Sequence, residues 1–336
     1  MNRHLKTGLQ LLLGILLAGF LMYYTYQDRS TEELVAVFTQ SDRTWIGLGA
    51  LTLLLVFIFR ALRWKLMLDS SGQEVSTGNT LLSVLILYFV NSLTPKLGEI
   101  ARCTVLYKTD KVPVATSLGT VVSERVIDAL VLFGGVGILL LFEFDRLASL
   151  FQATIFSGWT TQSTLILIGV LGLLAALGIG TLVYLRKQSG KDGIMGRISQ
   201  FADTALEAAR SIFKLEKPWL FFVHTLIVWA LLIFMNYCMV KALPATQEYG
   251  WYVAILLLFI GGIGWIFPTP NGMGTTNYII VQLFLILGME EKIGQDIGLL
   301  SNGLTFIFSL IYGGLALLWF MYLVFRQESL AEKESQ

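Results

Sequence analysis

Long apolar runs recur from one end of the chain to the other, separated by short polar stretches. A helix needs about 20 apolar residues to cross a bilayer, and the runs meet that length without the short alternation of a transmembrane barrel. The pattern therefore predicts an all-α polytopic membrane protein. The predicted full spans are 7–26, 45–62, 113–142, 164–185, 218–242 and 298–325.

Two further apolar regions are interrupted by proline and glycine. Region 80–107 contains TPKLGE, and region 251–288 contains PTPNGMG. Each fragment is short for a full span, and irregular backbone at membrane depth must be buried in protein or line a water-filled cavity. We therefore predict two re-entrant, broken hairpins.

The placement of Lys and Arg predicts the orientation. With the N-terminus inside, most basic residues fall in cytoplasmic stretches, which predicts a cytoplasmic N-terminus and C-terminus. The first apolar stretch follows Arg3 and Lys6, but no small-x-small cleavage site follows it, so we interpret it as an uncleaved first helix.

Each half of the chain reads as span, span, broken segment and span. Because each half crosses the membrane three times, an odd number, the second half is inverted relative to the first. Paired breaks at matching places in two inverted halves indicate a transport site near the midplane. The alternative is that both breaks are ordinary loops. The predicted parts are a first repeat (1–145), the first span and loop of the second repeat (146–193), a cytoplasmic amphipathic helix (194–217), the rest of the second repeat (218–326) and a cytoplasmic tail (327–336). The amphipathic helix is either a linker or a lipid-sensing element on the membrane surface.

The first break carries charged residues. Pro95 frees backbone carbonyls, and a helix that begins near Glu99 would point N–H groups toward an anion, with Arg102 and Lys96 in support. A lipid phosphate fits such a site. The alternative is that Glu99 and Arg102, three residues apart, pair with each other and hold the hairpin shut. The candidate residues are Asn91, Pro95, Lys96, Gly98, Glu99 and Arg102.

A second charged group lies within the predicted span 113–142, in the sequence SERVID. Glu124 and Asp128 share a helix face, and Arg125 can reach Asp128 at i+3. Charges in a span are costly in lipid, so they face the interior of the bundle. The six charges of these two groups sum to zero, which suits either a neutralised network or a zwitterionic headgroup.

The second break is neutral. It offers hydrogen bonds from Thr and Asn side chains, and its offset from Pro270 to Asn277 matches that from Pro95 to Arg102. The two breaks thus look like counterparts, one charged and one neutral. The candidate residues are Pro268, Pro270, Asn271, Gly272, Gly274 and Asn277.

Composition agrees with a membrane protein and narrows its chemistry. The 336 residues are 55% hydrophobic and 14% charged, with a mean hydropathy of +0.70. No nucleophilic triad, zincin motif, phosphate-binding loop or dinucleotide motif is present, and the two cysteines are isolated, so we predict neither enzyme activity nor a cofactor, metal or nucleic-acid partner. Arg60, Arg63, Trp64 and Lys65 form a cluster predicted to set topology and contact anionic lipid at the cytoplasmic surface.

The motifs PKLGEIAR, SERVID and PTPNGMG, in this order and spacing, resemble those of the lysylphosphatidylglycerol synthase transmembrane family. The family includes the flippase-type membrane region of the bacterial multiple peptide resistance factor and small stand-alone membrane proteins. The resemblance implies a lipid flippase. The family pattern falls on Pro95, Gly98, Glu99, Arg102, Glu124, Arg125, Asp128, Pro268, Pro270, Gly272 and Gly274. It does not include Asn91, Lys96, Asn271 and Asn277.

Two departures from the family pattern concern the second break, and a third concerns the overall chain. Asn271 replaces the first of two glycines that usually follow the second proline, and Asn277 stands near the place of an acidic residue. If that acid carries protons or binds a cationic headgroup, this protein differs in substrate or coupling. No aminoacyl-transferase domain follows the membrane region, so synthesis of lysylphosphatidylglycerol is not expected.

The sequence therefore predicts a transporter that moves a phospholipid or a polyprenyl-phosphate-linked lipid between the leaflets of a bacterial inner membrane. Its predicted partners are membrane lipids, anionic or zwitterionic, and the sequence leaves a homo-oligomer open. Two alternatives are a membrane-embedded enzyme acting on a lipid phosphate and a lipid-binding scaffold of a cell-envelope synthase.

Overall fold

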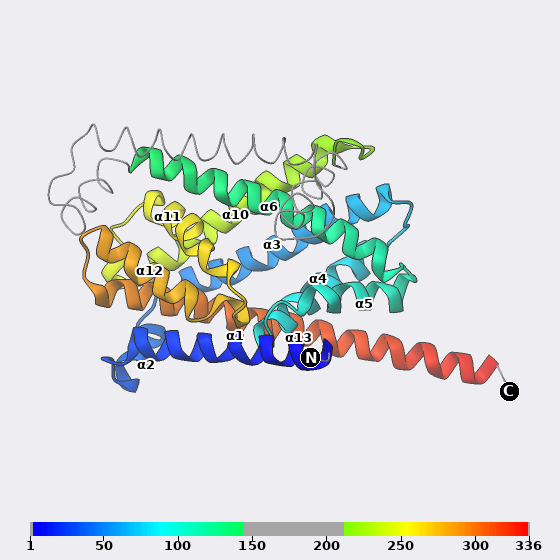
Figure 1. The fold of residues 1–336 in the computed structure, drawn as a ribbon, viewed down its shortest axis with the longest axis horizontal. Coiled ribbons are helices and arrows are strands. Elements are labelled where there is room, and N and C mark those ends of the chain that lie inside the picture. The colour runs from blue at the N-terminus through cyan, green and yellow to red at the C-terminus, as the bar shows by residue number, and fades with distance from the viewer. Residues whose placement is uncertain (1–2, 144–211, 335–336) are drawn as a thin grey trace, which may run out of the picture. The chain divides into compact units, whose positions relative to one another are not determined.

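The computed structural model describes residues 3–143 and 212–334, in which every regular element is helical (Figure 1). The elements before the gap are α1 (Arg3–Tyr26), α2 (Thr31–Thr39), α3 (Arg43–Ser70), α4 (Thr77–Leu93), α5 (Gly98–Asp110) and α6 (Val114–Phe142). Those after it are α10 (Pro218–Ala242), η1 (Pro244–Thr246), α11 (Trp251–Gly262), η2 (Ile263–Ile266), η3 (Pro270–Gly272), α12 (Thr275–Ile286) and α13 (Glu291–Glu334).

The described residues contain four helices that are long and apolar enough to cross a membrane. They are α3, α6, α10 and residues Glu291–Arg326 of α13. The apolar part of α1, Leu11–Tyr26, is shorter, as are α4 and the stretch Trp251–Ile266. The all-helical membrane class is thus confirmed. The predicted span 164–185 and residues 194–211 of the predicted amphipathic helix 194–217 lie outside the described residues.

Two helices extend past their predicted limits. α3 continues to Ser70 rather than ending at residue 62, and α13 covers Glu291–Glu334 rather than 298–325. Hydropathy detects only the apolar part of a helix, whereas backbone hydrogen bonding continues into polar sequence. α3 begins at a cap, because the Asp42 carboxylate accepts hydrogen bonds from the N–H groups of Thr44 and Trp45.

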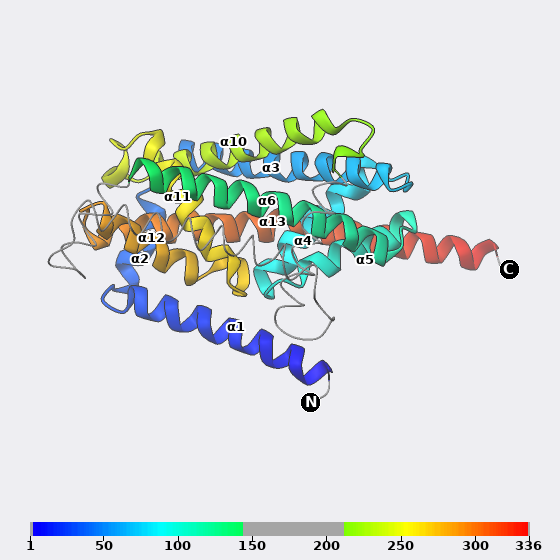
Figure 2. The ribbon, with the colours of Figure 1, turned by 45° about the horizontal axis from the view of Figure 1, so that its top comes forward.

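Contacts divide the chain into two compact units, residues 1–122 with 214–336 and residues 123–213. In the first unit α3 lies along α10, α4 along α5, and α12 along α13, which also crosses α4 (Figures 1 and 2). In the second unit the described residues are the remainder of α6 and residues 212–213.

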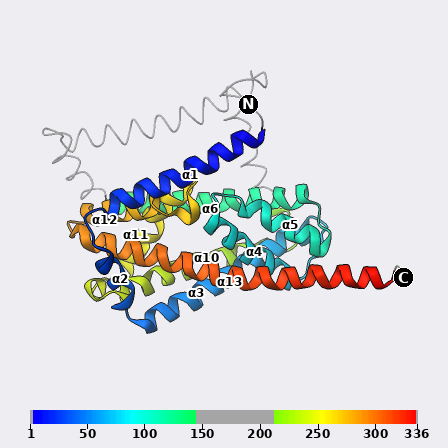
Figure 3. The ribbon, with the colours of Figure 1, turned by 90° about the horizontal axis from the view of Figure 1, so that it is seen from below.

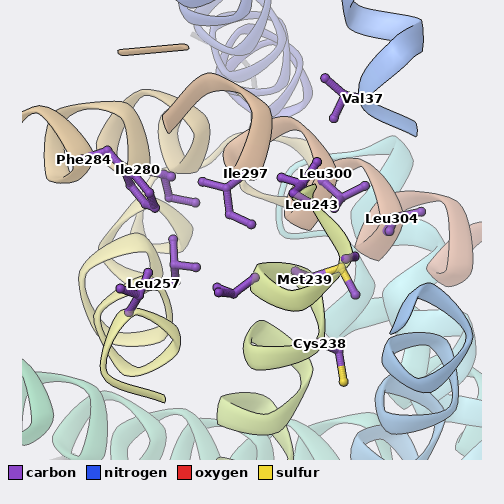
Figure 4. Close-up of a cluster of buried hydrophobic side chains, with 13 residues drawn as sticks. Val37, Cys238, Met239, Leu243, Leu257, Ile280, Phe284, Ile297, Leu300 and Leu304 are labelled. Atoms are coloured by element: carbon purple, nitrogen blue, oxygen red, sulfur yellow. The ribbon is translucent and has the colours of Figure 1, made fainter. Parts of the chain in front are cut away.

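A hydrophobic cluster joins α10, α11, α12 and α13 in the first unit (Figure 4). Ile280 and Phe284 of α12 pack with Ile297 and Leu300 of α13, and α2 adds Val37. A second cluster joins α3, α4, α5, the start of α6, and α10. Cys103 and Cys238 are buried and not disulfide-bonded, and one lies in each cluster.

α13 and α4 approach each other closely at Gly313. A Cβ atom at Gly313 would lie 2.6 Å from the Leu85 carbonyl oxygen and 2.5 Å from Phe89 Cβ. Such distances are shorter than van der Waals contact, so the glycine permits this backbone approach, as small residues do at helix crossings in membranes.

We predict that Gly313→Ala lowers the free energy of unfolding by about 1–3 kcal/mol, because the added methyl group must push α13 away from α4. Thermal unfolding of the purified protein in detergent measures the effect. Gly47→Ala in α3 is the matched control, since a Cβ there meets nothing within 4 Å, and alanine favours a helix by up to about 1 kcal/mol. Equal effects of the two substitutions would contradict the close packing at Gly313.

Candidate functional site

The first break is a tight turn between α4 and α5. α4 ends at Leu93, α5 begins at Gly98, and Lys96 between them has a left-handed backbone with φ of 61°. A Cβ at Gly98 would clash with the Leu87 carbonyl oxygen. The Gly98 N–H donates to Asn91 Oδ1 at 2.8 Å. The predicted break is therefore confirmed at residues 94–97, and Asn91 takes the first N–H of α5 that an anion would otherwise meet.

The second break is longer than the sequence indicated. Its irregular backbone begins with the 3₁₀ turn η2 at Ile263, ahead of Pro268, and continues to Gly274. Asn271 and Gly272 both have positive φ, 50° and 69°. Among non-glycine residues asparagine tolerates this conformation best, which gives a physical reason for asparagine at a position where the resembled family usually has glycine.

The two breaks touch each other. Lys96 Nζ donates a hydrogen bond to the Trp265 carbonyl oxygen, at 2.6 Å. Gly14 of α1 lies against both, because a Cβ there would clash with the Pro268 carbonyl oxygen and lie 3.0 Å from Pro95 Cγ. α1 packs against α12 and η3, and Figure 3 shows it beside α12. The sequence predicted that the breaks are counterparts, but not that they meet, nor that Lys96 binds a carbonyl of the second break.

Arg102 of α5 is 1% exposed. Its Nε lies 3.0 Å from Glu99 Oε2, and its guanidinium carbon lies 4.4 Å from the centroid of the Trp64 ring in α3. Trp64 in turn donates from Nε1 to Thr120 Oγ1 at 2.9 Å. The pairing of Glu99 with Arg102, which the sequence offered as the alternative to an anion site, is present, whereas the aromatic partner was missed, because nothing in the sequence links Trp64 to Arg102.

The cluster predicted at the cytoplasmic surface is partly inside the protein. Arg63 and Trp64 are fully buried, and Arg63 donates from Nη1 to Thr225 Oγ1 at 3.3 Å, with its guanidinium carbon 5.5 Å from the centroid of the Phe221 ring. The surface interpretation is therefore wrong for these two residues, because α3 turns Arg63 toward α10 and Trp64 toward α5 and the start of α6. Lys65 remains partly exposed and pairs with Asp69 at 2.8 Å.

The charged group of α6 pairs within its own helix. Arg125 Nη2 lies 3.4 Å from Glu124 Oε1, and Arg125 Nη1 lies 3.5 Å from Asp128 Oδ2. The Glu124 side chain is fully buried, while that of Arg125 is 39% exposed. The predicted i+3 pair is confirmed, and Arg125 keeps the most accessible side chain of the three.

A neutral network joins α1, α12 and α13 around Asn277. Its Oδ1 accepts from Asn302 Nδ2 at 2.8 Å and from the Gly274 N–H at 3.2 Å. Its Nδ2 donates to Tyr26 Oη at 3.0 Å, and Tyr26 donates onward to the Gln295 carbonyl oxygen. Asn277 is thus a buried, hydrogen-bonded crosslink between three helices.

Ion pairs join the start of α2 to α13 next to this network. Arg29 lies 2.9 Å from Asp296 Oδ1 and 3.2 Å from Glu33 Oε2, and Lys292 lies 2.7 Å from Glu33 Oε1. The hydrogen bond from Lys292, followed by that from the Ser30 N–H, lowers the pKa of Glu33 to about 2. The contribution of these pairs to stability is present above the usual pKa of a glutamate and falls as the pH approaches 2.

The structure thus brings several predicted site residues together. Pro95 and Pro268 meet at Gly14, Lys96 donates to the Trp265 carbonyl oxygen, and the pairs Asn91–Gly98, Glu99–Arg102 and Gly274–Asn277 each share a contact. Pro270 opens the turn that buries Asn271 and Gly272. Among the described residues, no group of three or more His, Cys, Asp or Glu side chains is placed to hold a metal ion.

Comparison with known proteins places the chain in a family. The sequence profile described as lysylphosphatidylglycerol synthase TM region matches residues 11–313, so the chain belongs to this family of membrane proteins. A UPF0104 membrane protein of Methanocaldococcus jannaschii is 24% identical over 93% of this chain and 94% of its own length. A UPF0104 membrane protein of Pyrococcus horikoshii is 21% identical over 94% and 97%. No solved structure matches the chain.

We predict that Glu99→Gln lowers the free energy of unfolding by about 2 kcal/mol, because it removes a carboxylate from the buried guanidinium of Arg102. Breaking a fully buried pair costs about 3–5 kcal/mol, and the 23% exposure of the Glu99 side chain reduces the loss. Thermal unfolding of Glu99→Gln, Arg102→Met and the double variant measures the coupling. Additive losses would show that the pair contributes nothing.

We also predict that Asn277→Leu lowers the free energy of unfolding by about 2–4 kcal/mol, because the buried Gly274 N–H and the Asn302 amide lose their acceptor. The control is Asn236→Leu in α10, since the Asn236 amide donates to the Leu232 carbonyl oxygen of its own helix, at 2.9 Å. The midpoint of thermal unfolding should fall further for Asn277→Leu, and a larger fall for the control would contradict the crosslinking role.

Proposed function

We propose that this protein moves a phospholipid or a polyprenyl-phosphate-linked lipid between the leaflets of a cytoplasmic membrane. Membership of a lipid-related membrane family supports a role in lipid handling. The observation that carries the proposal is the contact between the two helix breaks, through Lys96 and the Trp265 carbonyl oxygen. Broken helices that meet inside a membrane protein mark substrate and ion sites in transporters.

The proposed topology is six full spans and two re-entrant hairpins in an inverted repeat, with both termini in the cytoplasm. The paired breaks support it, since each joins two helices that are short for a full span. In this arrangement the halves rock against each other, and the bond between Lys96 and Trp265 breaks and re-forms as access alternates.

Arg102 in the first unit and Arg125 in the second are each proposed as a ligand of a lipid phosphate. A guanidinium has five N–H donors, so each arginine can bind phosphate oxygens while it keeps a carboxylate partner. Glu99 holds Arg102 in a fixed place, and Glu124 with Asp128 does so for Arg125. The same carboxylates neutralise the arginines between lipids and contact a cationic headgroup where the lipid has one.

Membrane lipids are the proposed partners, and a bacterial inner membrane is the proposed location. The archaeal relatives extend the same family to other prokaryotic membranes. The proposal includes no covalent step, so the protein acts as a transporter rather than as an enzyme.

A scaffold that binds lipid without moving it is the second candidate. The observation that favours it is that both proposed phosphate ligands, Arg102 and Arg125, pair with carboxylates three residues or fewer away. In a pure scaffold, exchanging Glu99 and Arg102 would keep the pair and leave every property of the protein unchanged.

We predict that Arg125→Ala slows lipid translocation at least tenfold, because it removes the more accessible of the proposed phosphate ligands. The measurement uses the purified full chain in vesicles of phosphatidylglycerol and phosphatidylethanolamine, with a trace of fluorescent phosphatidylglycerol and a membrane-impermeant quencher. Glu124→Gln should slow translocation as well, because Arg125 then loses one carboxylate.

The matched control is Arg43→Ala, which removes an exposed arginine from the start of α3. It should translocate lipid at the unmodified rate. Thermal unfolding of all variants separates a transport defect from a folding defect. Undiminished translocation in both Arg125→Ala and Glu124→Gln, or no translocation by the unmodified protein, would overturn the proposal.

A further inference from the structure

Buried oxygen atoms converge at the second break. Thr275 Oγ1, in the first turn of α12, lies 2.9 Å from the Gly264 carbonyl oxygen and 3.1 Å from the Gly272 carbonyl oxygen. Thr269 Oγ1 lies 3.0 Å from the same hydroxyl. All four residues are buried.

The sequence builds this cluster through proline and glycine. Pro268 has no N–H, so the Gly264 carbonyl lacks the i+4 donor of a continuing α-helix. A Cβ at Gly264 would lie 2.5 Å from Thr276 Oγ1, and one at Gly272 would lie 2.8 Å from the same atom. The two glycines therefore let the start of α12 come close to two backbone carbonyls.

The cluster has more oxygen acceptors than protons. Thr269 and Thr275 carry one hydroxyl proton each. If Thr269 donates to Thr275, the Thr275 proton reaches one of the two carbonyl oxygens, and the other receives no proton from this pair. A surplus of acceptors at a buried place is the arrangement that a bound cation satisfies.

The hydroxyl of Thr276 adds a second observation. It is buried, with the residue 7% exposed, and it has no hydrogen-bond partner among the described residues. Its position between Gly264 and Gly272 places it beside the same two residues whose carbonyls face Thr275. A buried hydroxyl without a partner costs roughly 1–3 kcal/mol, and a ligand at this place would remove that cost.

We propose that these five oxygen atoms bind a sodium ion. The ligands are the carbonyl oxygens of Gly264 and Gly272 and the hydroxyl oxygens of Thr269, Thr275 and Thr276. Carbonyls at the ends of unwound helices are the usual ligands of Na⁺ in membrane transporters.

The chemistry of the ligands selects a small monovalent cation. The stretch 263–277 has no carboxylate, and hard divalent cations take carboxylate ligands and hold their water strongly. The oxygens lie 2.9–3.1 Å from Thr275 Oγ1, and a small ion needs less separation between its ligands than a large one, so this spacing favours Na⁺ over K⁺.

Nearby positive charge tunes the site. Lys96 binds the carbonyl of Trp265, the residue after Gly264, so its ammonium opposes a second cation. The start of α12 also opposes a cation, whereas the carbonyl end of α11 and η2 favours one. Removal of the Lys96 charge should therefore strengthen Na⁺ binding. If Lys96 served only to hold the two breaks together, its removal would instead loosen the second break and weaken Na⁺ binding.

The ion site rests on this geometry, and its role as the coupling ion rests on the proposed lipid transport. In that role Na⁺ binding would favour one conformation of the second break, and the hydrogen bond from Lys96 would couple that conformation to the first break.

The test is the midpoint of thermal unfolding of the purified full chain in detergent, titrated with NaCl at constant ionic strength against choline chloride, with KCl as a second series. We expect a saturable rise of several degrees with Na⁺, a smaller rise with K⁺ and none with choline. Equilibrium dialysis with radioactive Na⁺ should give one ion per chain.

Thr276→Val is the decisive variant. Valine has nearly the shape of threonine, and it removes a buried hydroxyl that has no described partner. Without Na⁺ the variant should be at least as stable as the unmodified protein, yet its Na⁺ affinity should fall at least tenfold. Thr275→Val should lose Na⁺ affinity too, and Lys96→Gln should gain about threefold or more.

The control is Thr305→Val in α13, whose hydroxyl bonds the Ser301 carbonyl of its own helix at 2.7 Å. It should keep the Na⁺ response. No difference between Na⁺ and choline, or an unmodified Na⁺ response in Thr276→Val, would overturn the site. Because binding is measured without lipid translocation, Na⁺ binding by a protein that moves no lipid would count against the proposed function alone.

Discussion

A helix that breaks in apolar surroundings leaves backbone groups that water cannot reach, and the protein must supply their partners. In this chain another part of the fold supplies hydrogen-bond partners to each break. Lys96 donates to the Trp265 carbonyl oxygen across the two breaks, and Thr275 donates toward the Gly264 carbonyl that Pro268 leaves without an i+4 donor. Gly14 of α1 completes the junction, because a side chain there would force the breaks apart. The packing of α1 on η3 and α12 follows from this requirement.

The same surroundings govern the buried arginines. Arg63 and Arg102 have almost no exposed surface, yet each guanidinium has an aromatic ring beneath it, from Phe221 and Trp64. A ring face attracts a cation without adding a hydrogen-bond acceptor. This combination is costly for stability alone, and a phosphate-binding role would explain why the fold holds arginines at such depth.

Local chemistry determined what the sequence could predict. The helical class and the two breaks followed from hydropathy and from the missing N–H of Pro95 and Pro268, and the Glu99–Arg102 pair followed from helical spacing. The sequence did not predict the polar ends of α3 and α13, because a hydropathy profile marks only the apolar part of a helix. The ring of Trp64 under Arg102, the burial of Arg63 and the junction at Gly14 depend on which helices pack together, and no local pattern encodes that.

The two breaks differ in charge, because the first contains charged side chains and the second contains none. The first holds a guanidinium at its helical end, and the ligand proposed for it is an anion, while the second gathers neutral oxygens, and the ligand proposed for it is a cation. Lys96 connects them, since it belongs to the first break and occupies a carbonyl of the second. A cation at the second break would weaken that bond by repulsion, and a released Lys96 would add positive charge near an incoming phosphate. Coupling of this kind is reciprocal, so in the proposed transporter the lipid would favour binding of the ion as much as the ion favours binding of the lipid.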